Sequence, residues 1–201
     1  MKKYFAKVIK AAAVTALLAS SHAMATLLSG GLNVDNGFVA YLATDDNTQG
    51  VYLAQGNNWG HTYSFNNVSL AQGQDYFLHI YAYDQGGIAG FLGEFNLTGT
   101  DHSFANGGSN LTTNTTDWSV STSGWNNYQA PRSLGSNGNW PWGYRPGVSA
   151  GAEWIWSADP YNENYNYFTT AITASAVSEP GTLALLGLGL VGLVTARRNI
   201  K

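Results

Sequence analysis

The chain has 201 residues, with nine Lys and Arg against twelve Asp and Glu, and it contains no cysteine. Seven of the nine basic residues lie in the first ten or the last five positions, so residues 26–178 keep two arginines and eleven acids, a formal charge of −9. Nucleic acid is excluded as a partner, because its binding depends on Lys and Arg displacing counterions. Without cysteine, disulfides, thiolate metal sites and cysteine nucleophiles are excluded as well.

Residues 1–25 have the features of a signal peptide. Four lysines within the first ten residues precede an apolar run over 11–19. Ala23-Met24-Ala25 then has the small-x-small form that signal peptidase cleaves, which would leave Thr26 as the first residue. We therefore expect the domain over residues 26–176 to be exported.

The domain itself reads as strands and turns, because it is rich in Gly, Asn, Thr, Ser, Tyr and Trp. In the clearest alternating run, 75–84, Leu78, Ile80 and Ala82 fall on one face and aromatic residues on the other. Strands are expected at 37–43, 50–55, 63–70, 75–84, 90–97, 117–123, 152–158 and 166–174. About eight strands at this spacing predict an all-β fold, a single antiparallel β-sandwich of jelly-roll type.

Three stretches add a family resemblance: DNGFVAYLATDD from residue 35, DYFLHIYAYDQGGIAGFLGEFNL from residue 75 and AEWIWSAD from residue 152. Together they resemble the galactose-binding-like jelly roll found in sugar-binding modules and beside some glycosidases. The resemblance implies glycan binding through loops at one edge of the sandwich. It also implies a structural calcium ion, for which the oxygen-rich turn at Asp45 and Asp46 is the candidate site. A plain polar turn is the alternative there.

The loop NGNWPWGYRPG, residues 137–147, is the candidate glycan site. Aromatic faces pack against the C–H patches of sugar rings, polar groups bind the hydroxyls, and two prolines stiffen the loop. The candidate residues are Asn139, Trp140, Trp142, Tyr144 and Arg145. Two structural alternatives stay open: Trp142 covers an open end of the sandwich, with Trp154 and Trp156 in the core, and Arg145 forms a salt bridge.

No catalytic motif stands out, so we expect no enzyme. The sequence lacks G-x-S-x-G, H-E-x-x-H and a phosphate-binding glycine loop. Glu94 and Glu153 could form a glycosidase pair only if the fold set them at a suitable separation.

Residues 177–201 form the tail, joined to the domain by a short linker at 173–176. An apolar run over 182–196 follows Ser178-Glu179-Pro180 and ends at Arg197-Arg198. Its 15 residues make roughly 22 Å of helix, short of the ~30 Å of a bilayer core. By the positive-inside bias, the two arginines should stay cytoplasmic.

This order of parts resembles the PEP-CTERM sorting signal on exported proteins of Gram-negative bacteria that make exopolysaccharide, with Ser178 in place of the motif's first proline. The resemblance implies recognition and cleavage by exosortase. It also implies a transient stay in the inner membrane through the C-terminal transmembrane helix, followed by release to the cell surface or extracellular matrix.

The function expected from these features is that of a non-catalytic, surface-sorted protein associated with exopolysaccharide or biofilm matrix. It would bind a neutral glycan through aromatic loops. The alternatives are a structural matrix or envelope protein without a specific ligand, and a glycan hydrolase.

Overall fold

The computed structural model describes residues 25–176, and Ala25–Ala176 form one compact unit. The predicted signal peptide and C-terminal helix lie outside the described residues. Within residues 25–176 no helix is long and apolar enough to cross a membrane.

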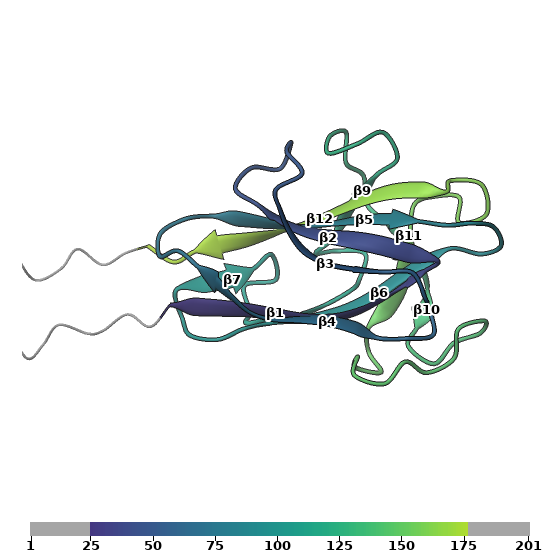
Figure 1. The fold of residues 1–201 in the computed structure, drawn as a ribbon, viewed down its shortest axis with the longest axis horizontal. Coiled ribbons are helices and arrows are strands. Elements are labelled where there is room, and N and C mark those ends of the chain that lie inside the picture. The colour runs from purple at the N-terminus through teal and green to yellow at the C-terminus, as the bar shows by residue number, and fades with distance from the viewer. Residues whose placement is uncertain (1–24, 177–201) are drawn as a thin grey trace, which may run out of the picture. The chain divides into compact units, whose positions relative to one another are not determined.

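Two antiparallel six-stranded sheets face each other as a β-sandwich (Figure 1). The first sheet consists of β10 (Arg132–Ser136), β11 (Glu153–Trp156), β6 (Gly90–Leu97), β1 (Thr26–Asp35) and β4 (Tyr63–Leu70) in this order, with β8 (Asn110–Thr112) paired to β6. The second consists of β3 (Val51–Gly56), β2 (Gly37–Ala43), β5 (Tyr76–Tyr83), β12 (Tyr165–Ala174) and β7 (His102–Phe104), with β9 (Ser119–Ser121) paired to β12. The predicted all-β sandwich is therefore present.

The strands predicted at 37–43, 63–70 and 90–97 coincide with β2, β4 and β6 at both ends. Four strands were not predicted: β1, β7, β8 and β10. The centre of β1 reads as a turn because it contains Ser29-Gly30-Gly31, yet β1 pairs with both β4 and β6. Gly30 is needed there, since a Cβ at this position would collide with the ring of Phe95. At the other end of the domain, β12 extends to Ala174 and takes up half of the predicted linker.

The main core lies between the sheets and follows the predicted alternation. Leu78, Ile80 and Ala82 of β5 are fully buried in it. Trp118 comes from the segment before β9 and packs edge-on against Phe91, with ring centroids 5.1 Å apart.

A smaller core lies on the outer face of the first sheet, where the loop over residues 137–152 folds back onto β6 and β11. Trp142 from this loop stacks on Trp154, with centroids 4.4 Å apart, and packs with Leu92 and Val148. Its indole Nε1 donates a hydrogen bond of 2.8 Å to Asp35 at the end of β1. The predicted glycan loop is therefore in large part a cover for the first sheet.

Candidate functional site: an aromatic sheet face

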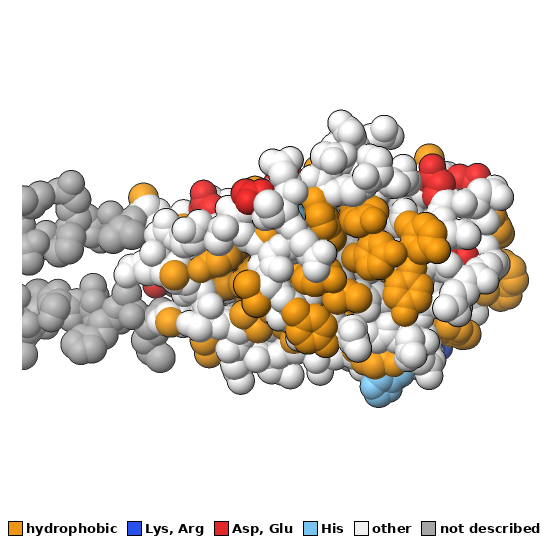
Figure 2. All heavy atoms as spheres, turned by 45° about the horizontal axis from the view of Figure 1, so that its top comes forward, with side chains coloured by type: hydrophobic (Ala, Val, Ile, Leu, Met, Phe, Trp, Pro, Cys, Tyr) orange, Lys and Arg blue, Asp and Glu red, His pale blue; other side chains and the backbone are white. Residues whose placement is uncertain are grey.

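The outer face of the second sheet carries a surface of aromatic rings, which we call the tyrosine face. Alternation along the strands turns these side chains outward while their neighbours enter the core. The face is formed by Tyr41, Tyr52, Tyr81, Tyr83, Tyr165 and Tyr167, from strands β2, β3, β5 and β12. Figure 2 shows this side of the domain, with hydrophobic side chains gathered on its surface.

Tyr81 lies at the centre of the tyrosine face. Its cross-strand partner on β12 is Tyr167, with ring centroids 5.1 Å apart, and its ring lies parallel to that of Tyr165 at 6.4 Å. Desolvation by burial, followed by the neighbouring tyrosines, raises the pKa of Tyr81 above its usual value of 10.0. The phenol therefore stays protonated at neutral pH and presents both a donor and an acceptor beside an apolar ring.

Trp125 covers one part of this face. Trp125, from the loop over residues 122–131, stacks on the imidazole of His79 with centroids 4.3 Å apart and meets Tyr167 edge-on at 4.9 Å. His79 is fully buried beneath it. Trp125 also meets Tyr41 edge-on at 6.2 Å, so its ring contacts residues of β2, β5 and β12 within the second sheet.

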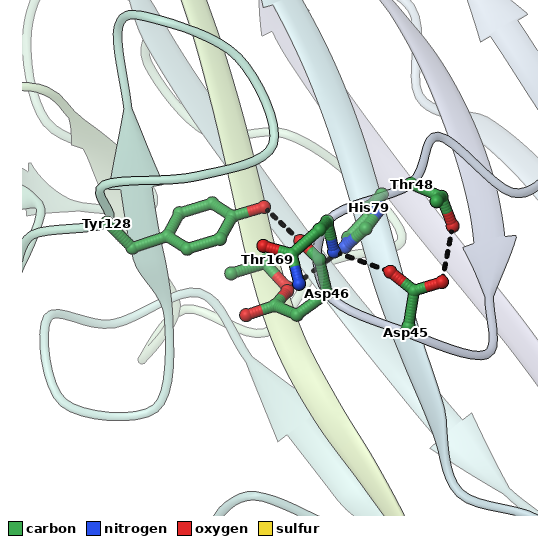
Figure 3. A network of polar contacts seen from close by, with 7 residues as sticks. Asp45, Asp46, Thr48, His79, Tyr128 and Thr169 are labelled. Atoms are coloured by element: carbon green, nitrogen blue, oxygen red, sulfur yellow. Dashed lines mark hydrogen bonds and ion pairs between the residues drawn. The ribbon is translucent and has the colours of Figure 1, made fainter.

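A polar cluster around Asp46 connects His79 with the loop that carries Trp125 (Figure 3). The Asp46 carboxylate contacts His79 Nε2 at 3.2 Å and accepts a hydrogen bond of 2.5 Å from the Thr169 hydroxyl. Its backbone oxygen accepts a bond of 3.0 Å from the Tyr128 hydroxyl. Burial, followed by the charge of Asp46, raises the pKa of Tyr128 far above that of free tyrosine. These bonds link the loops 44–50 and 122–131 over the second sheet.

The candidate calcium turn is part of this cluster. Asp45 accepts hydrogen bonds from the backbone of Asn47 at 2.8 Å and from the hydroxyl of Thr48 at 2.9 Å, which lower the pKa of its carboxyl. Within residues 25–176 no group of three or more His, Asp or Glu side chains could hold a metal ion. The contacts of Asp45 and Asp46 are those of a polar turn tied to the sheet.

The loop residues predicted to bind glycan do not form one surface. Trp140 is 84% exposed and Tyr144 56%, and Asn139 is exposed as well. Trp142 is only 2% exposed, because its ring fills the smaller core. A sugar cannot reach this ring, so Trp142 is a covering residue and not a surface aromatic.

Arg145 forms no salt bridge among the described residues, and its role as a glycan ligand stays a prediction. Its guanidinium lies over the ring of Trp59, 5.2 Å from the centroid, and donates a bond of 3.3 Å to the backbone oxygen of Gly60. Within residues 25–176 no acid lies at ion-pair distance from it. Arg145 instead fixes the loop over 57–62 against its own loop through a cation–π contact.

The two glutamates considered for hydrolysis have different surroundings. Glu94 lines a polar groove of about 550 Å³ on the first sheet and is the one acid among the residues that line it. Desolvation acts to raise its pKa, but hydrogen bonds from Ser149 and Asn110 outweigh this and lower it. Glu153 lies on β11, with its backbone bonded to Thr113, and does not line this groove.

Sequence reasoning missed the tyrosine face, although its signal was present. Tyr81 and Tyr83 alternate with core residues in one strand, and Tyr165 and Tyr167 do so in another. The alternation in β5 alone already predicts one apolar and one aromatic face for that strand. What was missing was the pairing of β5 with β12, which places Tyr83 opposite Tyr165 and Tyr81 opposite Tyr167.

Comparison with known proteins gives one match. The PEP-CTERM protein-sorting motif matches residues 176–199. No curated protein and no solved structure matches the chain. The match covers the tail that follows the described domain, and such a motif implies an exported protein that is held transiently in the membrane and processed by exosortase.

Proposed function

We propose that the domain is a non-catalytic module that binds a neutral glycan chain on the tyrosine face and thereby associates the sorted protein with exopolysaccharide or biofilm matrix. One observation carries the proposal: six tyrosine rings from four neighbouring strands share one outer face. This moves the expected site from the 137–147 loop, whose Trp142 is in the core, to the second sheet.

The chemistry of the face fits a sugar chain. Each ring offers an apolar surface for C–H patches, and each phenol offers a hydrogen-bonding group at its edge for hydroxyls. A tyrosine has only two side-chain torsions and is held here on a regular sheet, so little entropy is lost on binding. These features favour a ligand that is apolar on its ring faces and polar at its periphery.

Charge narrows the class of glycan. Residues 26–178 carry two arginines and eleven acids and contain no lysine. An anionic polysaccharide would be repelled by such a domain, whereas a neutral one pays no electrostatic penalty. The proposal is therefore restricted to neutral glycans.

The absence of catalysis is likewise a proposal. It is supported by the surroundings of Glu94, whose two carboxylate oxygens are engaged by Ser149 and Asn110, and by the position of Glu153 outside the groove that Glu94 lines. Most glycoside hydrolases use two carboxyl groups that flank the scissile bond.

The test is retention on immobilised neutral polysaccharides, including the exopolysaccharide of the producing bacterium. The protein used is the chain without residues 1–25, purified in a detergent that has no sugar headgroup. Tyr81→Ala and Tyr165→Ala should each weaken retention about tenfold, the effect of losing a contact worth roughly 1–2 kcal/mol.

Tyr161→Ala is the matched control. Tyr161 is 61% exposed, much like Tyr165 at 58%, but it lies in the loop before β12 and outside the tyrosine face. Its removal should leave retention unchanged. The proposal fails if no neutral polysaccharide retains the protein, or if all three variants bind like the parent.

A further inference from the structure

A small polar pocket lies at the edge of β9. Its volume is about 190 Å³, below the roughly 300–1,000 Å³ of pockets that take drug-sized ligands. Among the residues that line it are Ser121, Asn127, Gln129, Ala130, Ser157 and Glu163. They come from β9, from the loop that carries Trp125, and from the segment between β11 and β12. A pocket of this size fits one small ring.

Ser157 is the least expected residue in the lining of this pocket. It is 3% exposed, and its hydroxyl is buried without a hydrogen-bond partner among the described residues. A buried hydroxyl normally has a partner, and leaving it unpaired costs free energy. The hydroxyl is shielded from solvent, so it must turn about χ1 to reach a ligand in the pocket, and no internal hydrogen bond opposes that turn.

Some polar side chains of the lining already have partners within the protein: Ser121 Oγ accepts a bond of 3.1 Å from the Ser123 backbone, and one carboxylate oxygen of Glu163 accepts a bond of 3.4 Å from the Asp159 backbone. Backbone contacts fix the lining further. The backbone oxygen of Glu163 accepts hydrogen bonds of 2.9 Å from both Trp156 and Asn166. Gln129 is fixed by two backbone bonds of 2.8 Å to Val120 of β9. The site is thus preorganised, which lowers the entropic cost of binding.

The lining identifies the kind of ligand. Hydroxyl and amide groups supply donors and acceptors, and Glu163 supplies a strong acceptor for a hydroxyl. No Lys or Arg lines the pocket, so an anion would find no partner. An apolar molecule would leave these polar groups unpaired, a loss that lets such sites reject analogues without hydroxyls. A neutral, hydroxyl-rich ring satisfies all three conditions.

The pocket continues the tyrosine face. Ser121 is the direct cross-strand neighbour of Tyr167, and the ring of Tyr167 in turn meets Trp125 edge-on. From this arrangement we infer that the pocket binds the terminal neutral pyranose of a glycan whose chain lies across the tyrosine face. The domain would then recognise chain ends. The single-sugar site stands on the pocket alone, whereas the chain-end reading rests on the proposed function.

The probes are the methyl glycosides of glucose, galactose, mannose and N-acetylglucosamine, with cyclohexylmethanol as an apolar ring of similar size. Binding to the chain without residues 1–25 is followed by saturation-transfer NMR in a detergent that has no sugar headgroup. At least one glycoside should bind, and cyclohexylmethanol should not.

Three variants locate the binding. Ala130→Trp should fill the pocket and abolish glycoside binding, whereas Ala105→Trp, at an exposed alanine in the β7–β8 turn, should not. Glu163→Gln should weaken binding about tenfold, the loss expected for a charged acceptor. Ser157→Ala should weaken it about three- to tenfold without lowering the melting temperature, because the hydroxyl makes no bond inside the protein.

The inference is overturned if no glycoside binds, which would leave water as the occupant of the pocket, or if binding survives Ala130→Trp. Retention on polysaccharide without glycoside binding would overturn this inference and leave the proposed function standing. Glycoside binding without retention would support the single-sugar site and contradict the proposed function.

Discussion

Trp140 and Trp142 are two residues apart in one loop, and replacing each with alanine should have very different effects on stability. Trp142 is 2% exposed, stacks on Trp154 and donates its indole N–H to Asp35. Trp140 is 84% exposed. From the sequence, both were assigned to the same binding surface.

The size of the effect follows from these surroundings. Removing a buried tryptophan costs about 3–5 kcal/mol, and in a domain of this size each kcal/mol lowers the melting temperature by roughly 2–4 °C. Trp142→Ala should therefore lower it by roughly 6–20 °C. An exposed side chain such as Trp140 should change stability by no more than about 0.5 kcal/mol.

Trp142→Phe separates packing from the hydrogen bond. Phenylalanine keeps most of the apolar ring but leaves the Asp35 carboxylate without its donor, a loss of about 1.5–3 kcal/mol for a charged acceptor. Burial already raises the pKa of Asp35, and the bond from Trp142 opposes this rise. The deficit of the phenylalanine variant should thus shrink at acidic pH, where Asp35 is protonated and the bond matters less.

The assay is urea and thermal unfolding of residues 25–176, the compact unit, followed by far-ultraviolet circular dichroism at several pH values. Equal losses for Trp140→Ala and Trp142→Ala would refute the assignment of Trp142 to the smaller core. So would a loss below about 1 kcal/mol for Trp142→Ala.

Two further predictions concern the first sheet. Gly30→Ala should lower the free energy of unfolding in urea by about 1–3 kcal/mol, because its Cβ would meet the ring of Phe95. Gly31→Ala should be near neutral, since the nearest neighbour of its Cβ would lie at an ordinary 3.5 Å. Similar losses at both positions would contradict the packing of β1 on β6. Glu94, whose folded-state pKa lies below the usual 4.5, adds stability above that pH and loses it as the pH falls through the lower folded value. Ser149→Ala removes one donor to this carboxylate and should lower the free energy of unfolding by less than about 1 kcal/mol, because solvent screens the site. The loss should be largest near neutral pH and shrink in acid. A loss independent of pH would argue against the bond.

The strands were predictable where local patterning and tertiary environment agree. In β5 the core residues alternate with aromatic ones, and Leu78, Ile80 and Ala82 are buried as that pattern requires. In β1 the two disagree, because Ser29-Gly30-Gly31 reads as a turn while the packing of Phe95 requires glycine in mid-strand. Close approach between distant side chains leaves no signal in the local sequence.

The candidate site shows the same division. A loop rich in tryptophan and proline looks like a binding surface, but whether Trp142 faces solvent depends on Asp35 and Trp154, which are distant in the chain. The two tyrosine pairs become one surface only because β5 and β12 pair in a register that sets Tyr81 beside Tyr167.

By itself, the sequence determined the sorting tail, the acidic charge of the domain and its all-β class. These depend on the order of segments and on short-range periodicity, both of which can be read along the chain. The tertiary structure alone decided which aromatic residues are covered and which share an exposed face, and it closed the pocket between β9 and the segment before β12. Those features depend on strand register and on contacts between residues far apart in sequence, where one shifted pairing turns a side chain from solvent to core.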